Sequence, residues 1–195
     1  FRDAAERACL ASLAAVCSSW MYMGINYTGR WRAQPWGAPP GLGITASTHD
    51  GNAMAARMIC VLMLLQARQC TWLLEHPSRS VMEYIPEFSY LRMRVQRATT
   101  AMGAFNHDSR KVTMLLSCHD WHKALEKELP PNFAPKKAMT TSFIDGNNIS
   151  RCTGIASDLK ESQAYTPECA QAVYDAWLQH KHVEFRAEDY GDAHA

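Results

Sequence analysis

The sequence predicts an α/β fold, and two observations carry that prediction. A helix-length apolar segment, residues 51–68, is followed after a short turn by a strand-like run, residues 71–75. That run ends abruptly at Glu75, His76 and the helix-breaking Pro77. A buried parallel strand brings an acid to the rim of an α/β sheet in this way, and ligands of open sheets bind at that rim. Glu75 is therefore a candidate functional residue; the alternative is that it starts a loop or caps the next helix.

Length, charge and apolar runs restrict the classes to which this protein can belong. The chain has 195 residues, enough for one domain with a full core, and we expect residues 1–180 to form it, with a polar tail over 181–195. Lys and Arg number 20 against 19 Asp and Glu, a net charge of +1, so any contact with nucleic acid has to be local. The most apolar run, residues 58–65, is far shorter than the roughly 20 residues of a membrane span, and we expect no transmembrane segment.

Cysteine usage bears on the compartment. The 7 cysteines are an odd number and form no CxxC pair, which favours reduced thiols in an intracellular reducing compartment: nucleus, cytoplasm or organelle. The chain starts at Phe1 rather than Met, and we expect its N-terminal side to be incomplete.

The N-terminal half combines an ambiguous apolar run with a long irregular segment. Residues 9–16 fit either a helix or a buried strand, because a run this short has no decisive periodicity. Residues 24–50 are rich in Gly, Pro and Trp and predict a long loop insertion. Loops of this length in compact domains usually carry function or move.

The C-terminal half predicts short elements and a last helix. Two short helices separated at Pro86 are expected over residues 80–97, and a strand pair over 99–105 and 111–117, with a turn-forming connection between its strands. A short helix is expected over 119–129.

After this helix the pattern weakens and then recovers. Residues 136–151 predict little regular structure apart from a turn at residues 145–148. Residues 167–180 predict the final helix.

Several short motifs in this order resemble a known family. They are Cys17-Ser18-Ser19-Trp20, Thr28-Gly29-Arg30, Gly51-Asn52 with Arg57, the segment from Trp72 to Ser80, and the segment from Leu159 to Tyr165. Together, over roughly residues 9–177, they resemble DNA cytosine-5 methyltransferase-like proteins of the kind abundant in dinoflagellate algae. The resemblance implies a Rossmann-like sheet of the class I methyltransferase type, here its C-terminal half, which ends in an antiparallel strand pair.

The resemblance also implies a chemistry. In cytosine-5 methylation a thiolate adds to C6 of a flipped base, a carboxylate steadies N3, and C5 takes a methyl group from S-adenosylmethionine. Cys17 is then the nucleophile and Glu75 the carboxylate. Gly51 and Asn52 would contact the cofactor.

The chain departs from the family pattern in ways that favour an inactive descendant. Val16 stands where the family has proline before the nucleophile, and His76-Pro77 replaces the Asn-Val after the glutamate. The nearest approach to a glycine-rich cofactor loop is Gly41-Leu42-Gly43, which lies in a proline-led segment. S-adenosylmethionine is expected only if the enzyme is active.

Two other functions stay open. One is a non-catalytic accessory subunit of a larger assembly, in an organelle or elsewhere, whose partners are other protein chains. The other is a nucleic-acid-binding module in which Arg30, Arg32 and Arg57 contact phosphates or bases and nearby tryptophans stack on bases. His119 and His122 could share one helix face, but a metal site needs a further ligand, so we expect no metal.

Overall fold

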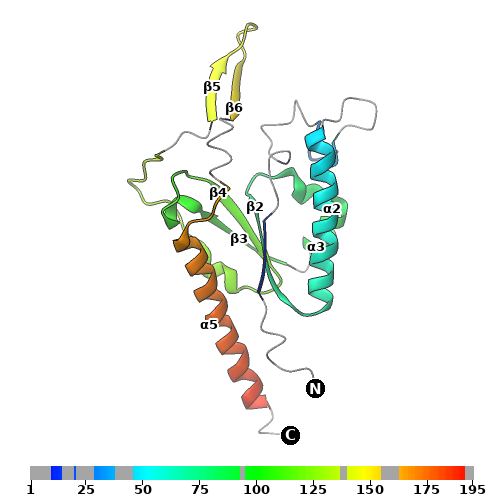
Figure 1. Ribbon diagram of the computed structural model, residues 1–195, viewed down its shortest axis with the longest axis vertical. Coiled ribbons are helices and arrows are strands. Elements are labelled where there is room, and N and C mark those ends of the chain that lie inside the picture. The colour runs from blue at the N-terminus through cyan, green and yellow to red at the C-terminus, as the bar shows by residue number, and fades with distance from the viewer. Residues whose placement is uncertain are drawn as a thin grey trace.

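The computed structural model describes residues 10–14, 20, 29–37, 46–92, 95–136, 140–154 and 163–191. Within these ranges the protein is a mixed α/β structure built on a 4-stranded sheet of order β1-β2-β4-β3. A 2-stranded hairpin, β5-β6, projects from one end of the molecule, and helices α2 and α5 lie on opposite sides of the sheet (Figure 1). The expected α/β class is confirmed.

A β-α-β unit forms the first part of the sheet. Strand β1 (Leu10–Ala14) is connected through helix α2 (Ala46–Ala67) to strand β2 (Thr71–Pro77), and β1 and β2 pair in parallel. The apolar run that the sequence left ambiguous is therefore a strand. Helix α2 is rich in Ala, Met and Leu, which favour helix. It ends where Gln69 adopts a left-handed φ of 55° and the N–H of Cys70 bonds to the carbonyl of Leu65.

An antiparallel pair completes the sheet, as the sequence predicts. Strand β4 (Val112–Ser117) pairs antiparallel with both β2 and β3 (Gln96–Ala101). The first strand of this pair begins at Gln96, earlier than expected, and it ends at Ala101 because residues 102–105 turn into a 3-10 helix, η4 (Met102–Phe105). Asn106 ends η4 in the left-handed region at φ 60°.

Two cores cover the two faces of the sheet. Alternate residues of β2 point to opposite faces, so Leu74 packs with Ile59 and Leu62 of α2, whereas Leu73 packs with Ala176 of α5 (Pro167–Gly191). Every residue of β2 is buried, as expected of a strand that is covered on both faces.

The short helices differ from the sequence expectation in type and length. Residues 80–97 contain the 3-10 helix η3 (Val81–Tyr84), capped by the Ser80 hydroxyl, and the helix α3 (Pro86–Arg92), so the predicted break at Pro86 is confirmed. The second of these helices is shorter than expected because β3 begins at Gln96. The helix expected over 119–129 is a single 3-10 segment, η5 (Trp121–Leu125).

Three boundaries were wrong. Helix α2 begins at Ala46, so residues 46–50 are helical rather than part of the 24–50 loop. Weak structure was expected over residues 136–151, but residues 140–154 form the hairpin of β5 (Thr140–Ile144) and β6 (Ser150–Gly154), whose predicted turn is fixed by hydrogen bonds to the Asp145 carboxylate. Helix α5 continues to Gly191, past the expected end at 180, because residues 181–191 contain no proline and only the final glycine.

Among the described residues, no helix combines the length and apolar character that crossing a membrane requires.

Candidate functional site

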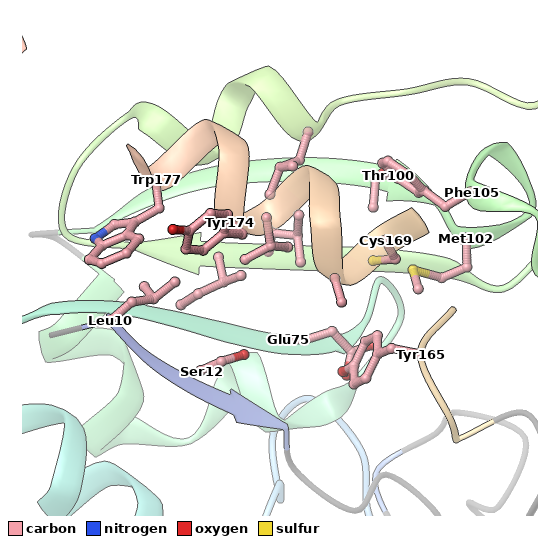
Figure 2. A pocket seen from close by; sticks show the side chains of 15 residues that line it. Leu10, Ser12, Glu75, Thr100, Met102, Phe105, Tyr165, Cys169, Tyr174 and Trp177 are labelled. Carbon is pink, nitrogen blue, oxygen red and sulfur yellow. The ribbon is translucent and has the colours of Figure 1, made fainter. Parts of the chain in front are cut away.

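A cavity of about 440 Å³ lies between the sheet and helix α5. Its floor comes from all strands of the sheet and its other wall from α5, and Figure 2 shows Glu75 and Tyr165 toward one end and Trp177 at the other. A cavity of this size, mostly apolar with a few polar groups, is typical of small-molecule sites. The side chains that line it include Leu10, Ser12, Leu73, Glu75, Thr100, Met102, Phe105, Leu115, Leu125, Tyr165, Cys169, Val173, Tyr174 and Trp177.

Glu75 reaches this cavity because of the alternation along β2. Leu73 and Glu75 face α5, while His76 faces the other core and packs edge-on against Phe88 at 6.1 Å between ring centroids. Glu75 pairs in register with Ala14, the last residue of β1. The carboxylate thus stands at the carboxyl ends of two parallel strands, as the sequence predicts, although β2 itself continues to Pro77.

The Glu75 carboxylate has different partners at its two oxygens. Its Oε2 accepts a 2.5 Å hydrogen bond from the hydroxyl of Tyr165. Its Oε1 faces Lys111 Nζ at 3.6 Å, an ion pair too long for a hydrogen bond, and has no hydrogen-bond partner among the described residues. Lys111 also lies over the Tyr165 ring, 5.3 Å from its centroid. Glu75 is only 6% exposed, so its negative charge is buried and only partly compensated.

Cys169 is the cysteine that the described structure places in the cavity. It lies in the first turn of α5 and its thiol is free. Burial raises the pKa of this thiol, and the nearby charge of Glu75 raises it further. Because a thiolate is the reactive form, this environment keeps Cys169 a poor nucleophile near neutral pH.

The predicted nucleophile, Cys17, lies outside the described residues. Its neighbourhood is known only through β1, whose last residue, Ala14, pairs with Glu75. The structure therefore places the predicted carboxylate in a cavity, and the pairing of Cys17 with it stays a prediction.

Gly51 and Asn52, the predicted cofactor contacts, do not border the cavity. Both lie inside α2, on the other face of the sheet, and Gly51 is buried. The Asn52 side-chain amide donates to the carbonyl of Trp36 at 2.9 Å, so it holds a loop against the helix. S-adenosylmethionine carries a ribose and an ammonium group that need hydrogen-bond acceptors, and a carboxylate is the usual ribose ligand in nucleotide-binding sheets. Gly51 and Asn52 supply no such carboxylate and do not line the cavity, so they would not contact a cofactor bound in it.

The three arginines predicted to contact nucleic acid have separate environments. Arg30 is 1% exposed, its guanidinium stacks on Trp20 at 3.5 Å from the ring centroid, and it donates to the carbonyls of Pro35 and Thr48. Burial lowers the pKa of Arg30 to about 10, which leaves it charged at neutral pH. It therefore ties residues 29–37 to the start of α2, and this burial argues against contact with a phosphate.

Arg32 and Arg57 are exposed and lie on different segments. Arg32 lies over the Tyr84 ring at 5.1 Å from its centroid, and Arg57 is on α2. The grouping of these arginines around a nucleic acid therefore stays a prediction. Within the described ranges, no group of three or more His, Cys, Asp or Glu side chains is arranged to bind a metal ion.

Sequence reasoning missed most of the cavity wall. Tyr165 belonged to a motif of the resemblance, but no role was assigned to it. Cys169, Val173 and Trp177 recur every four residues along α5, the spacing of one helix face, and this periodicity was the available signal. To place that helix face beside Glu75, one must know that α5 packs against the face of β2 that carries Glu75. The spacing of residues along α5 does not give this information.

Comparisons with known proteins add no family. Neither the protein-family models, nor the curated proteins, nor the solved structures contain a match to this chain.

Proposed function

We propose that this chain is a methyltransferase-like domain whose Glu75 cavity holds a planar ring, cytosine being the ring that the family resemblance implies. The observation that carries the proposal is the position of the Glu75 carboxylate, buried beside a cavity at the carboxyl ends of β1 and β2, with no hydrogen-bond partner for Oε1 among the described residues. The exocyclic amine of cytosine is a hydrogen-bond donor for this oxygen.

The order of strands supports the same proposal. A parallel pair, β1 and β2, is followed in space by the antiparallel strands β4 and β3. The resemblance implies a sheet that ends in this way. Aromatic side chains of Phe105 and Tyr165 border the Glu75 end of the cavity and supply faces against which a ring can stack.

Methyl transfer requires more than this cavity. The nucleophile would be Cys17, and the methyl donor would have to be held by residues other than Gly51 and Asn52. We therefore propose ring binding as the primary function, with catalysis dependent on Cys17.

Two measurements test the proposal. Calorimetric titration of the chain with S-adenosylmethionine, with Glu75→Ala as a comparison, establishes whether the cofactor binds at all. Incubation with S-adenosylmethionine and an oligonucleotide that contains 5-fluorocytosine then tests for a covalent adduct, because fluorine at C5 blocks the release of the thiol. Catalysis predicts an adduct with the natural chain and none with Cys17→Ser; absence of both cofactor binding and adduct would leave only a non-catalytic role.

An accessory-subunit function is the second candidate, and a specific surface favours it. Val61 and Leu64 on the outer side of α2 are 42% and 59% exposed, and Ile144 and Ile149 beside the hairpin turn are 69% and 52% exposed. Exposed apolar side chains that cluster on one element often mark protein interfaces. Co-purification of a stoichiometric partner that is lost on replacing Val61 and Leu64 with Ser would support this function over catalysis.

A further inference from the structure

The cavity is lined by residues with polar atoms that the fold leaves without hydrogen-bond partners. Glu75 Oε1, Thr100 Oγ1 and Trp177 Nε1 are buried and have no hydrogen-bond partner among the described residues, and all three residues line the cavity. Thr100 is 1% exposed and Glu75 is 6% exposed. Buried polar atoms in native proteins are nearly always hydrogen-bonded to protein or to ordered water, so such atoms beside a cavity are sites that a bound ligand can complete.

The chemistry around Glu75 restricts the head of that ligand, which is the group that bonds to Glu75 Oε1. Oε1 needs a donor, because Oε2 is already bonded to Tyr165. A cationic head at Oε1 would approach Lys111 Nζ, which stands only 3.6 Å from the same oxygen. An anionic head would face the Glu75 carboxylate itself. A neutral donor, such as a hydroxyl or a primary amide, avoids both repulsions.

The length and lining of the cavity restrict the rest of the ligand. Cys169 and Trp177 both line the cavity and lie eight residues apart on α5 (177 − 169), which corresponds to about 12 Å along the helix axis. That distance exceeds the width of a single base. The wall between these positions is mostly apolar and includes Leu73, Leu115 and Val173, while the hydroxyls of Ser12 and Tyr174 are its polar groups.

We propose that the cavity binds an elongated, mainly apolar small molecule that ends in a neutral hydrogen-bond donor. The donor bonds to Glu75 Oε1, and the apolar part runs along α5 toward Trp177. The inference rests on the proposed use of the Glu75 cavity as a ligand site, and it does not depend on methyl transfer.

Titration of the full chain with a matched ligand series tests this inference. Octan-1-ol and octanamide carry a neutral donor, methyl octyl ether lacks the donor, and octylamine and octanoate are charged. Loss of one hydrogen bond to a charged acceptor corresponds to roughly tenfold in affinity, so we expect the alcohol and the amide to bind about tenfold tighter than the ether. The charged molecules should bind more weakly than the alcohol.

Variants locate the binding. Glu75→Met should remove the preference, so that alcohol and ether bind with about equal affinity. Glu87→Met, on the exposed side of α3, should retain the preference. Val173→Trp fills the apolar section and should abolish binding of every member of the series. Circular dichroism and thermal unfolding of each variant establish that it is folded.

A resonance shift gives a readout that does not need a variant. The indole N–H of Trp177 should shift on addition of octan-1-ol, while that of Trp72, buried in the core on the other face of the sheet, should not. Equal affinity for alcohol and ether, or an unmoved Trp177 resonance, would overturn the inference. A covalent adduct at Cys17 without binding of the alcohol would overturn it while leaving the proposed ring binding intact.

Discussion

The hydroxyl of Tyr165 donates a 2.5 Å hydrogen bond to Oε2 of Glu75, although the two residues are 90 positions apart in the sequence. This bond joins the end of β2 to the residue just before α5, at the polar end of the cavity. It fixes the orientation of the carboxylate and leaves Oε1 directed to other partners.

Removing this bond should cost stability. Tyr165→Phe deletes the donor and keeps the ring; because Tyr165 is 40% exposed, we expect a loss of about 1 to 2 kcal/mol in the free energy of unfolding. Urea denaturation measures it. Tyr174→Phe removes the hydroxyl of a cavity-lining tyrosine of α5 that is 51% exposed and does not bond to Glu75; it is the matched control and should change little. Equal effects of the two variants would show that the hydrogen bond contributes nothing specific.

Stability should fall as the pH is lowered, through His76. Burial, with a smaller contribution from Arg97, lowers the pKa of His76 to about 4. The unfolded chain has the ordinary value near 6.5, so between about pH 6.5 and 4 the unfolded state binds more protons than the folded state. The stability present above pH 6.5 is therefore lost as the pH falls, by roughly 3 kcal/mol from this group.

His122 adds to the same trend, because burial also lowers its pKa. Denaturation at pH values from 7.5 to 4 measures the free energy of unfolding. In His76→Gln this free energy should change less with pH than it does in the natural chain. His49→Gln changes an exposed histidine and should leave the dependence as it is. An unchanged slope in His76→Gln would contradict the assignment.

Arg30 should behave as a structural residue. Lysine cannot stack on Trp20 and also bond to the carbonyls of both Pro35 and Thr48, so Arg30→Lys should destabilise the fold by about 2 kcal/mol. Arg32→Lys keeps a cation over Tyr84 and should change stability by less than about 0.5 kcal/mol. Thermal or chemical denaturation compares the two, and a neutral Arg30→Lys would refute the structural role.

Gly103 should be sensitive to a single added methyl group. A Cβ there would lie 2.7 Å from Leu129 Cδ2 and from Phe133 Cε2, so these side chains would have to move. We expect Gly103→Ala to cost about 1 kcal/mol, the low end of overpacking, because the clashing atoms are the ends of side chains. Gly146→Ala, where a Cβ meets nothing within 4 Å, should be nearly neutral and serves as the control in the same denaturation assay.

The position of Glu75 was predictable because an apolar strand that stops at an acid has one common meaning in an α/β sheet. The antiparallel pair over β3 and β4 was predictable for a similar reason, since strand-like runs flank a turn-forming connection. The side of the sheet that Glu75 faces was not predictable, because a strand that is buried on both faces shows no alternation of polarity. The burial of Arg30 was not predictable for a different reason. Its stacking partner and its carbonyl acceptors come from separate segments of the sequence.

The sequence by itself determined the local elements: a long helix from its Ala, Met and Leu content, a buried strand from its apolar run, and breaks at its prolines and turn formers. These depend on interactions among neighbouring residues, so a short window of sequence contains them. Only the tertiary structure decided that α5 covers the face of β2 that carries Glu75, and that Tyr165 and Lys111 meet its carboxylate. Such contacts depend on which faces pack together, and that choice is made by burial over the whole chain rather than by any one segment.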